Sequence, residues 1–161
     1  MKNNNPSDIT RIIKILLTFS IILSCEKDDI CIEGSENTNR VTIGFLKHDS
    51  KLPTGINLVN IKSIDNDSII HEEFSEDILR LPLKVNSDKT QYLLNYQDIL
   101  DTLTIYHKPT HKFLNRSCGF KSNFLINPNT KIIKEYGWIR EVSIIKDSIF
   151  NEQQTNIYIH Y

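Results

Sequence analysis

The 161-residue sequence contains no alanine, only five glycines, one tryptophan and one methionine. Alanine is the strongest helix former, so its absence beside many β-branched and aromatic residues favours strands. A genome poor in G and C would also deplete alanine, and part of this bias therefore comes from nucleotide composition. The few glycines form no phosphate-binding loop.

An excess of charge of either sign is also missing, because nineteen basic residues face twenty acidic ones and the net charge is −1. Nucleic-acid binding would need a basic stripe or patch, and the overall charge gives no support for such a partner. Charged residues make up 24% and apolar residues 39% of the chain. These proportions are typical of a folded domain and not of a disordered one.

No apolar run is long enough to span a membrane. Residues 15–23 form an uncharged apolar run of nine, preceded by Lys2, Arg11 and Lys14. A spanning helix needs about 20 apolar residues, whereas a run of nine after a basic start is typical of a secretory signal. We predict that residues 1–24 are a helical signal peptide that is removed on export.

The apolar run ends in Ile22-Leu23-Ser24-Cys25, which resembles the bacterial lipobox. The resemblance implies cleavage before Cys25 and a diacylglycerol on its sulfur. Each buried CH₂ contributes about 0.8 kcal/mol, so two or three acyl chains anchor a protein stably. The alternative is a signal that is uncleaved, or cleaved without lipidation, with a chance cysteine. We predict an outer-membrane lipoprotein whose membrane contact is the lipid on Cys25.

An acidic cluster follows directly, formed by Glu26, Lys27, Asp28 and Asp29. It is similar to the export signal of Bacteroidota surface lipoproteins, which implies a protein facing outward from the cell. The alternatives are a solvated acidic linker and a lipoprotein that faces the periplasm. We favour the cell surface.

Two further cysteines, Cys31 and Cys118, remain after lipidation. An even pair in an oxidising compartment favours a disulfide, while two free thiols or a metal pair are the alternatives. Neither cysteine has the close Cys-x2-Cys neighbour of a zinc site. Cys31 lies six residues after Cys25, at most about 20 Å away in an extended chain. A disulfide would therefore hold the domain against the membrane.

From Val41 onward, short apolar runs alternate with turn residues, a pattern that is typical of strands. The clearest period of two covers Leu79 to Val85, where Pro82 predicts an edge or a break. The other predicted strands are 41–45, 102–106, 118–124, 138–146 and 155–161. Predicted turns lie at 53–55, 66–67, 86–88, 109–110 and 127–129, and short helices at 72–79 and 96–100.

This spacing predicts an all-β domain, an antiparallel β-sandwich or small barrel, over residues 41–161. Residues 25–40 would be the lipidated N-terminus and a short acidic tether. No internal repeat is visible.

Several residue groups contain the side chains of catalytic or metal sites without their spacing. Pro109 lies between His107 and His111 and excludes a helical zinc pair, although a hairpin could still oppose the two rings. His48-Asp49-Ser50 are adjacent and cannot converge as a triad. The acidic stretch from Asp65 to Asp77 lacks the glycine of a calcium loop. We predict no catalytic residue, metal site or cofactor.

Aromatic residues near the C-terminus offer a different possibility. Tyr136, Trp138, Tyr158 and Tyr161 could stack on sugar rings. A lone Trp beside Gly137 is more often a core residue at the start of a strand. We keep a glycan platform as a minor alternative to a core role.

Four segments together resemble a family of small Bacteroidota outer-membrane lipoproteins of unknown function. They are Cys25–Gly34, Leu81-Pro-Leu83, Asp101–Tyr106 and Ser117-Cys-Gly-Phe120, and the resemblance extends to Asn156–Tyr161. It implies an all-β secreted domain and the Cys31–Cys118 pairing, but no activity. We predict a lipid-anchored, non-catalytic envelope domain that binds a protein or glycan or has a structural role. The alternative is a small envelope hydrolase or a glycan-binding module whose site is not recognisable.

Overall fold

The computed structural model describes residues 10–11, 14, 31, 37–128, 130–133 and 137–161. From Val41 onward the described part is all-β, as the sequence predicts. Its strands are β1 (Val41–Leu46), β2 (Ile56–Ser63), β3 (Ile69–Glu76), β4 (Ile78–Leu81), β5 (Lys89–Tyr96), β6 (Ile99–Asn115), β7 (Gly119–Ile126), β8 (Lys131–Ile133), β9 (Glu141–Ile144), β10 (Ser148–Ile149) and β11 (Ile157–His160).

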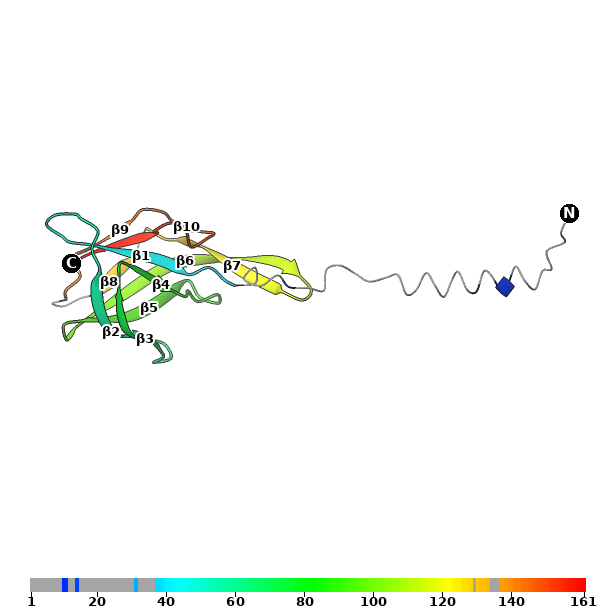
Figure 1. Cartoon of the computed structure of the whole chain (residues 1–161), viewed down its shortest axis with the longest axis horizontal. Helices are drawn as coiled ribbons and strands as arrows, with labels where there is room; N and C mark the ends of the chain where they lie inside the picture. The colour runs from blue at the N-terminus through cyan, green and yellow to red at the C-terminus, as the bar shows by residue number, and fades with distance from the viewer. Residues whose placement is uncertain (1–9, 12–13, 15–30, 32–36, 129, 134–136) are drawn as a thin grey trace.

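The strands form two sheets that pack in a sandwich-like arrangement (Figure 1). The smaller sheet has the order β4-β1-β11-β9, and the larger has the order β10-β7-β6-β5-β2-β3, with β8 also paired to β6. The pairs are antiparallel except β1 with β11, which run parallel. The predicted sandwich is therefore confirmed, with one parallel pair that the sequence did not indicate.

The core lies between the sheets and draws on both. Phe45 of β1, Leu79 of β4 and Ile159 of β11 come from the smaller sheet, and Leu94 and Leu103 from the larger one; all are at most 1% exposed. Burial of such side chains is the main stabilising contribution to a domain of this size.

Strand β1 is buried on both faces, because residues 41–45 are all covered. Val41, Ile43 and Phe45 point into the sandwich, as their alternation predicts. On the other face the Tyr158 ring covers Gly44, where a Cβ would lie 2.4 Å from its Cε1. The glycine is needed here for this close approach.

The strand formed at Leu79–Val85 is shorter than the alternating pattern that predicts it. Strand β4 ends at Leu81, directly before Pro82, and it is the outer strand of its sheet. Both consequences predicted for Pro82, an edge position and a break, are confirmed. The strand predicted at 138–146 is also shorter, since β9 spans only Glu141–Ile144.

Both predicted helices are wrong. Residues 72–79 cover the end of β3 and the start of β4, and residues 96–100 cover the end of β5, a two-residue turn and the start of β6. Glutamates favour helices in isolation, but β3 pairs along its length with β2 and lies at the edge of the larger sheet. Its glutamates can therefore remain in water while Phe74 is buried, so sheet pairing overrides the local preference.

The turn predicted at Pro109–Thr110 is also wrong, because both residues lie within β6, opposite Phe124 and Asn123. Strand β5 begins at Lys89, opposite Tyr106. Beyond Tyr106 no described strand pairs with β6 on its β5 side, and a proline without an N–H is tolerated there.

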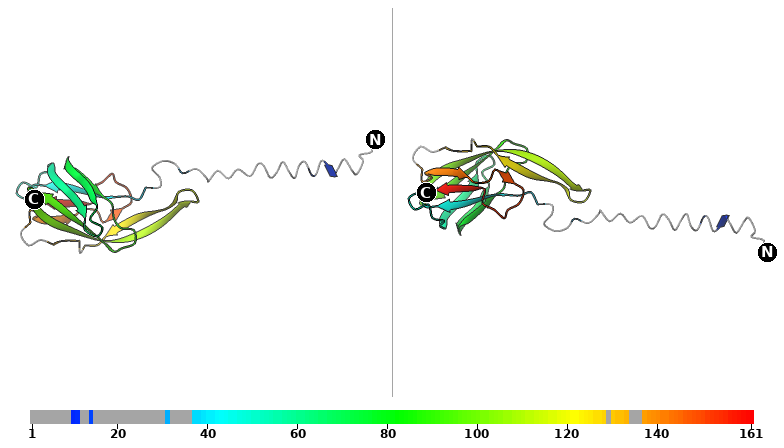
Figure 2. Two further views of the ribbon diagram at one scale, coloured as in Figure 1. Left: turned by 90° about the horizontal axis from the view of Figure 1, so that it is seen from below. Right: turned by 90° about the horizontal axis from the view of Figure 1, so that it is seen from above.

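Strand β6 and strand β7 continue past the rest of the sheet as a two-stranded ribbon. We call residues 107–126, which form this ribbon and its turn, the arm. Figures 1 and 2 show the arm projecting from one end of the sandwich, while the C-terminus lies at the other end. We call the remaining sandwich the body.

Most of the predicted signal peptide lies outside the described residues. The three residues of this segment that are described, Thr10, Arg11 and Lys14, have helical backbone. No helix within the described residues is long and apolar enough to cross a bilayer.

Candidate functional site

The residues predicted for lipidation and export, Cys25 and Glu26, Lys27, Asp28 and Asp29, lie outside the described residues. The predicted disulfide partners lie inside them. Cys31 is bonded to Cys118, with 5.1 Å between their Cα atoms.

Cys118 lies in the turn at the tip of the arm. The Cys118 amide donates a 2.6 Å hydrogen bond to Asn115 Oδ1, which closes the turn. Gly119 follows with φ +69°, in the left-handed region that favours glycine. The disulfide therefore joins the N-terminal tether to a hairpin tip whose turn has a defined, hydrogen-bonded conformation.

The last residues of the tether, which precede β1, lie against the arm. Thr38 Oγ1 accepts a hydrogen bond from the Ser122 amide, and Asn39 Nδ2 donates one to Asn123 Oδ1. Residues 37–40 are therefore attached to the domain, while residues 32–36 lie outside the described part.

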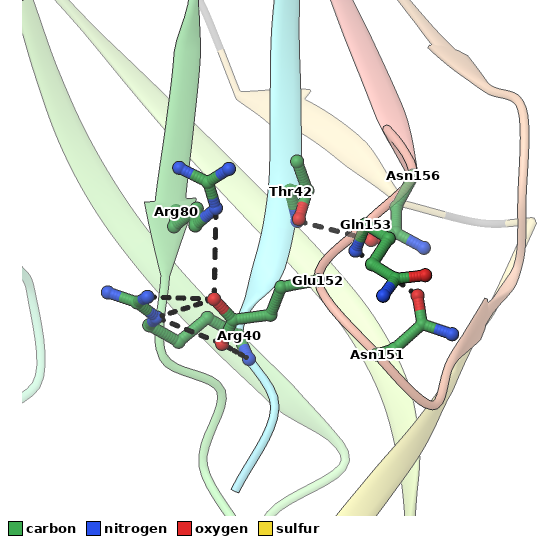
Figure 3. Close-up of polar contacts among 7 residues, drawn as sticks. All are labelled: Arg40, Thr42, Arg80, Asn151, Glu152, Gln153 and Asn156. Atoms are coloured by element: carbon green, nitrogen blue, oxygen red, sulfur yellow. Dashed lines mark hydrogen bonds and ion pairs between the residues drawn. The ribbon is translucent and has the colours of Figure 1, made fainter. Parts of the chain in front are cut away.

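A cluster of charged side chains forms where this segment meets β4 and the β10–β11 loop (Figure 3). Arg40 Nε and Nη2 donate to the two Glu152 oxygens at 3.0 and 2.7 Å, and the Arg40 amide donates to Oε1 at 2.9 Å. Arg80 Nε lies 3.7 Å from Glu152 Oε2. A carboxylate held by a bidentate guanidinium has a fixed orientation.

Glu152 is ionised in this setting. The hydrogen bond from Arg40 lowers the pKa of Glu152, partly opposed by burial, and raises the pKa of Arg40. The positive charge of Arg80 lowers the pKa of Glu152 further. Two guanidinium groups thus share one carboxylate and leave the cluster with a net charge of +1.

A buried amide fixes the loop that carries Glu152. Asn156 is 1% exposed, and its Oδ1 accepts a hydrogen bond from the Thr42 amide. Its Nδ2 donates to the carbonyls of Lys146 and Ser148. At the loop turn, Asn151 Oδ1 accepts a bond from the Gln153 amide. The ends of the loop are thereby tied to β1 and β10.

The charged cluster lines an open pocket of about 930 Å³, which we call the Arg40–Glu152 pocket. Its other lining residues are mainly polar and include four amides. They are Asn37, Thr38, Asn39, Pro82, Asn151 and Gln153. The volume is within the range of small-molecule sites, although most such sites are more apolar. Paired amides, guanidinium groups and a carboxylate suit a ligand rich in hydroxyl or amide groups.

The two histidines of the arm do not form a metal pair. His107 is 2% exposed, and its Nε2 hydrogen-bonds Thr90 Oγ1 at 2.8 Å. His111 Nδ1 bonds Ser122 Oγ. The two lie four residues apart on one strand, about 13 Å along it, and do not oppose each other across a turn. Burial lowers the pKa of His107.

Trp138 is a core residue. It is 6% exposed, its Nε1 donates to the Leu94 carbonyl, and its ring contacts Tyr96 and Tyr161. Tyr136 lies outside the described residues. The core role considered for Trp138 is the one observed.

The acidic stretch from Asp65 to Asp77 is divided between structural elements. Asp65 pairs with Lys84 at 2.5 Å and Asp67 with Lys62 at 3.5 Å. The glutamates that follow lie on β3. The carboxylates therefore do not surround a common loop.

One group was missed by the sequence reasoning. His48, Glu141 and His160 place one ligand atom each within 4.8 Å of one another. The Lys51 ammonium lies 3.5 Å from both Glu141 Oε2 and His160 Nδ1, and Ser143 Oγ bonds His160 Nε2. Burial, and then the charge of Lys51, lower the pKa of His160. Lys51 thus supplies the cation of this cluster, and both nitrogens of His160 are engaged.

A family of unknown function, DUF6452, matches residues 58–161. The chain belongs to this family. The match begins within β2, so the DUF6452 region supplies β4 and β11, and β1 from outside the match lies between them. No curated protein and no solved structure matches the chain.

Proposed function

We propose that this DUF6452 protein is a lipid-anchored, non-catalytic domain of the bacterial cell envelope. The proposed anchor is the acylated Cys25, left at the N-terminus when residues 1–24 are removed. Its support is the nine-residue apolar run ending in Ile22-Leu23-Ser24-Cys25. The bond between Cys31 and Cys118 also favours an oxidising compartment outside the cytoplasm.

The proposed location is the outer membrane of a member of the Bacteroidota, facing outward. Its support is the acidic cluster Glu26, Lys27, Asp28 and Asp29 directly after the anchor. A receptor that reads these charges would move the lipoprotein to the outer leaflet.

The proposed activity is binding of a polar ligand, and the observation that carries it is the Arg40–Glu152 pocket. Arg40 holds the Glu152 carboxylate, Asn156 fixes the loop that carries Glu152, and amide side chains line the same pocket. Fixed groups of this kind recognise hydroxyl and amide groups without losing rotamer freedom on binding. An envelope glycan is the ligand class that matches these groups best.

The same geometry is poorly suited to catalysis. Both oxygens of Glu152 are engaged by Arg40, and the lowered pKa makes this carboxylate a weak base. A hydrolytic site needs an acid and a base near the scissile bond. The described lining residues include no other carboxylate, histidine or cysteine.

Arg80 is the side chain with which to test the pocket, because its contact with Glu152 is long and its removal leaves the Arg40 pair intact. We expect Arg80→Gln to weaken binding to envelope glycans at least tenfold, measured by calorimetry with peptidoglycan fragments and lipopolysaccharide-derived oligosaccharides. Arg140→Gln, an exposed arginine outside the pocket lining, is the matched control. Equal affinities of the two variants, or no binding by the parent protein, would refute the glycan pocket.

Metabolic labelling with palmitate tests the anchor. We expect the label on the parent protein and none on Cys25→Ser, which should also remain unprocessed. An unlabelled parent protein would refute the lipoprotein.

A further inference from the structure

The tip of the arm exposes two phenylalanines. Phe113 and Phe120 face each other on β6 and β7, with ring centroids 5.1 Å apart. A cross-strand aromatic pair stabilises a hairpin, which explains their contact. It does not explain their exposure, which is 54% for Phe113 and 67% for Phe120.

The same tip is basic. Lys112 and Lys121 are a cross-strand pair next to the two phenylalanines, and Arg116 lies in the turn. Within the described residues neither lysine takes part in an ion pair. The sequence has no Asp or Glu from residue 102 to residue 134, in a chain whose net charge is −1. The arm therefore carries four basic residues and no acidic one.

The disulfide determines how far this tip can lie from the N-terminus. Cys118 lies in the tip and is bonded to Cys31, which is six residues from Cys25. Six residues span at most about 20 Å. A tether this short gives the tip a high effective concentration at whatever surface holds Cys25.

We propose that the tip of the arm docks into the headgroup region of the membrane, against anionic lipids. Phe113 and Phe120 enter the interface, and Lys112 and Lys121 contact the lipid phosphates. The inference rests on the proposed anchor at Cys25, which brings the tip to the membrane. Aromatic side chains bury apolar area at an interface, and lysines contribute attraction to anionic lipids.

One other occupant is available within the chain. The tether carries Glu26, Asp28 and Asp29, which could pair with the basic arm instead. Lipid is favoured because carboxylates offer no apolar surface to cover two exposed phenylalanine rings.

The test uses the processed lipoprotein, purified from the envelope and incorporated into phosphatidylcholine vesicles with or without phosphatidylglycerol. Phe120→Trp reports contact with brominated lipids by fluorescence quenching. The matched control is Phe150→Trp, an equally large residue that is 55% exposed but follows β10 and lies outside the arm. The native Trp138 is buried and gives a common background. Mass spectrometry of the same sample measures the acyl chains.

We expect strong quenching at position 120 in anionic vesicles and none at position 150. Each lysine near an anionic surface favours docking about fivefold. Lys112→Gln and Lys121→Gln should therefore each lower the ratio of docked to undocked tip by that factor. Omitting phosphatidylglycerol should also weaken the quenching.

Equal quenching at positions 120 and 150, or none at 120 in acylated protein, would overturn the docking. Quenching at 120 that appears only after Glu26→Gln, Asp28→Asn and Asp29→Asn would assign the basic tip to the tether and would also overturn it. A sample without acyl chains would refute the anchor alone. In that case, vesicles added to the unacylated Phe120→Trp protein would still test the docking: quenching would support it, and no quenching would overturn it.

Discussion

The body and the arm use the same residue type in opposite ways. In the body, Phe45 is 1% exposed and packs between the two sheets, whereas Phe120 in the arm is 67% exposed. The body has strands on both sides of β1, and the outer half of β6 has one partner strand. The body therefore holds most of the core, and the outer part of the arm is free to supply a contact surface.

A covalent bond joins the tip of the arm to the tether. Cys118→Ser opens a link between residues 87 apart. Loop-closure entropy predicts a loss of about 4.6 kcal/mol in the free energy of unfolding. Urea denaturation measures it, and Cys31→Ser should give the same loss. A loss below about 1 kcal/mol would mean that packing alone holds the arm and the tether.

Matched truncations separate the two regions. Phe45→Ala should lower the free energy of unfolding by about 3–5 kcal/mol, because it leaves a cavity between the sheets. Phe120→Ala should change it by less than about 1 kcal/mol, because the side chain is mostly exposed. Similar losses would show that the tip of the arm contributes to stability as much as the core does.

The amide below the Arg40–Glu152 pocket should matter more than the one at its rim. Asn156→Ala removes three hydrogen bonds of a buried side chain and should cost about 2 kcal/mol. Asn151→Ala removes one local bond and should cost less than about 0.5 kcal/mol. Thermal unfolding compares the two variants, and the reverse order would refute the anchoring role of Asn156.

The smallest effect concerns pH. Arg40 holds the pKa of Glu152 below its ordinary value, so the ionised carboxylate stabilises the folded state. This contribution is fully present above the unfolded pKa and is lost as the pH falls through the folded one. Glu152→Gln should cost about 1 kcal/mol or less at pH 7, since the pair is partly exposed. The difference should vanish in acid, and a difference that persists there would refute the ionic origin.

Sequence patterns predicted the parts of the fold that depend on local chemistry. The alternation at Leu79–Val85 and the effect of Pro82 both appear in β4. Pro109 led to the wrong prediction of a turn, because the pairing of β6 with β7, which places Pro109 opposite Phe124, overrides its turn propensity. The glutamates of β3 led to the wrong prediction of a helix, because the local sequence does not show that this segment is an edge strand whose glutamates remain in water.

The candidate site was beyond prediction for another reason. Arg40 and Glu152 are 112 residues apart, and nothing in their local sequence links them. The arm is different, because its basic character is visible in the absence of acidic residues from 102 to 134. Only the hairpin geometry shows that these lysines lie beside exposed aromatic rings next to the tethered cysteine.

The most direct test is the intact mass of the mature protein extracted from the envelope with detergent. We predict a polypeptide that begins at Cys25 and carries two or three acyl chains. Deacylation should lower its mass by the mass of those chains and by nothing else. It should gain two hydrogens on reduction of the Cys31–Cys118 bond. A polypeptide that retains residues 1–24, or one that begins at an unmodified Cys25, would contradict a domain anchored by lipid and would remove the reason for an arm at the membrane.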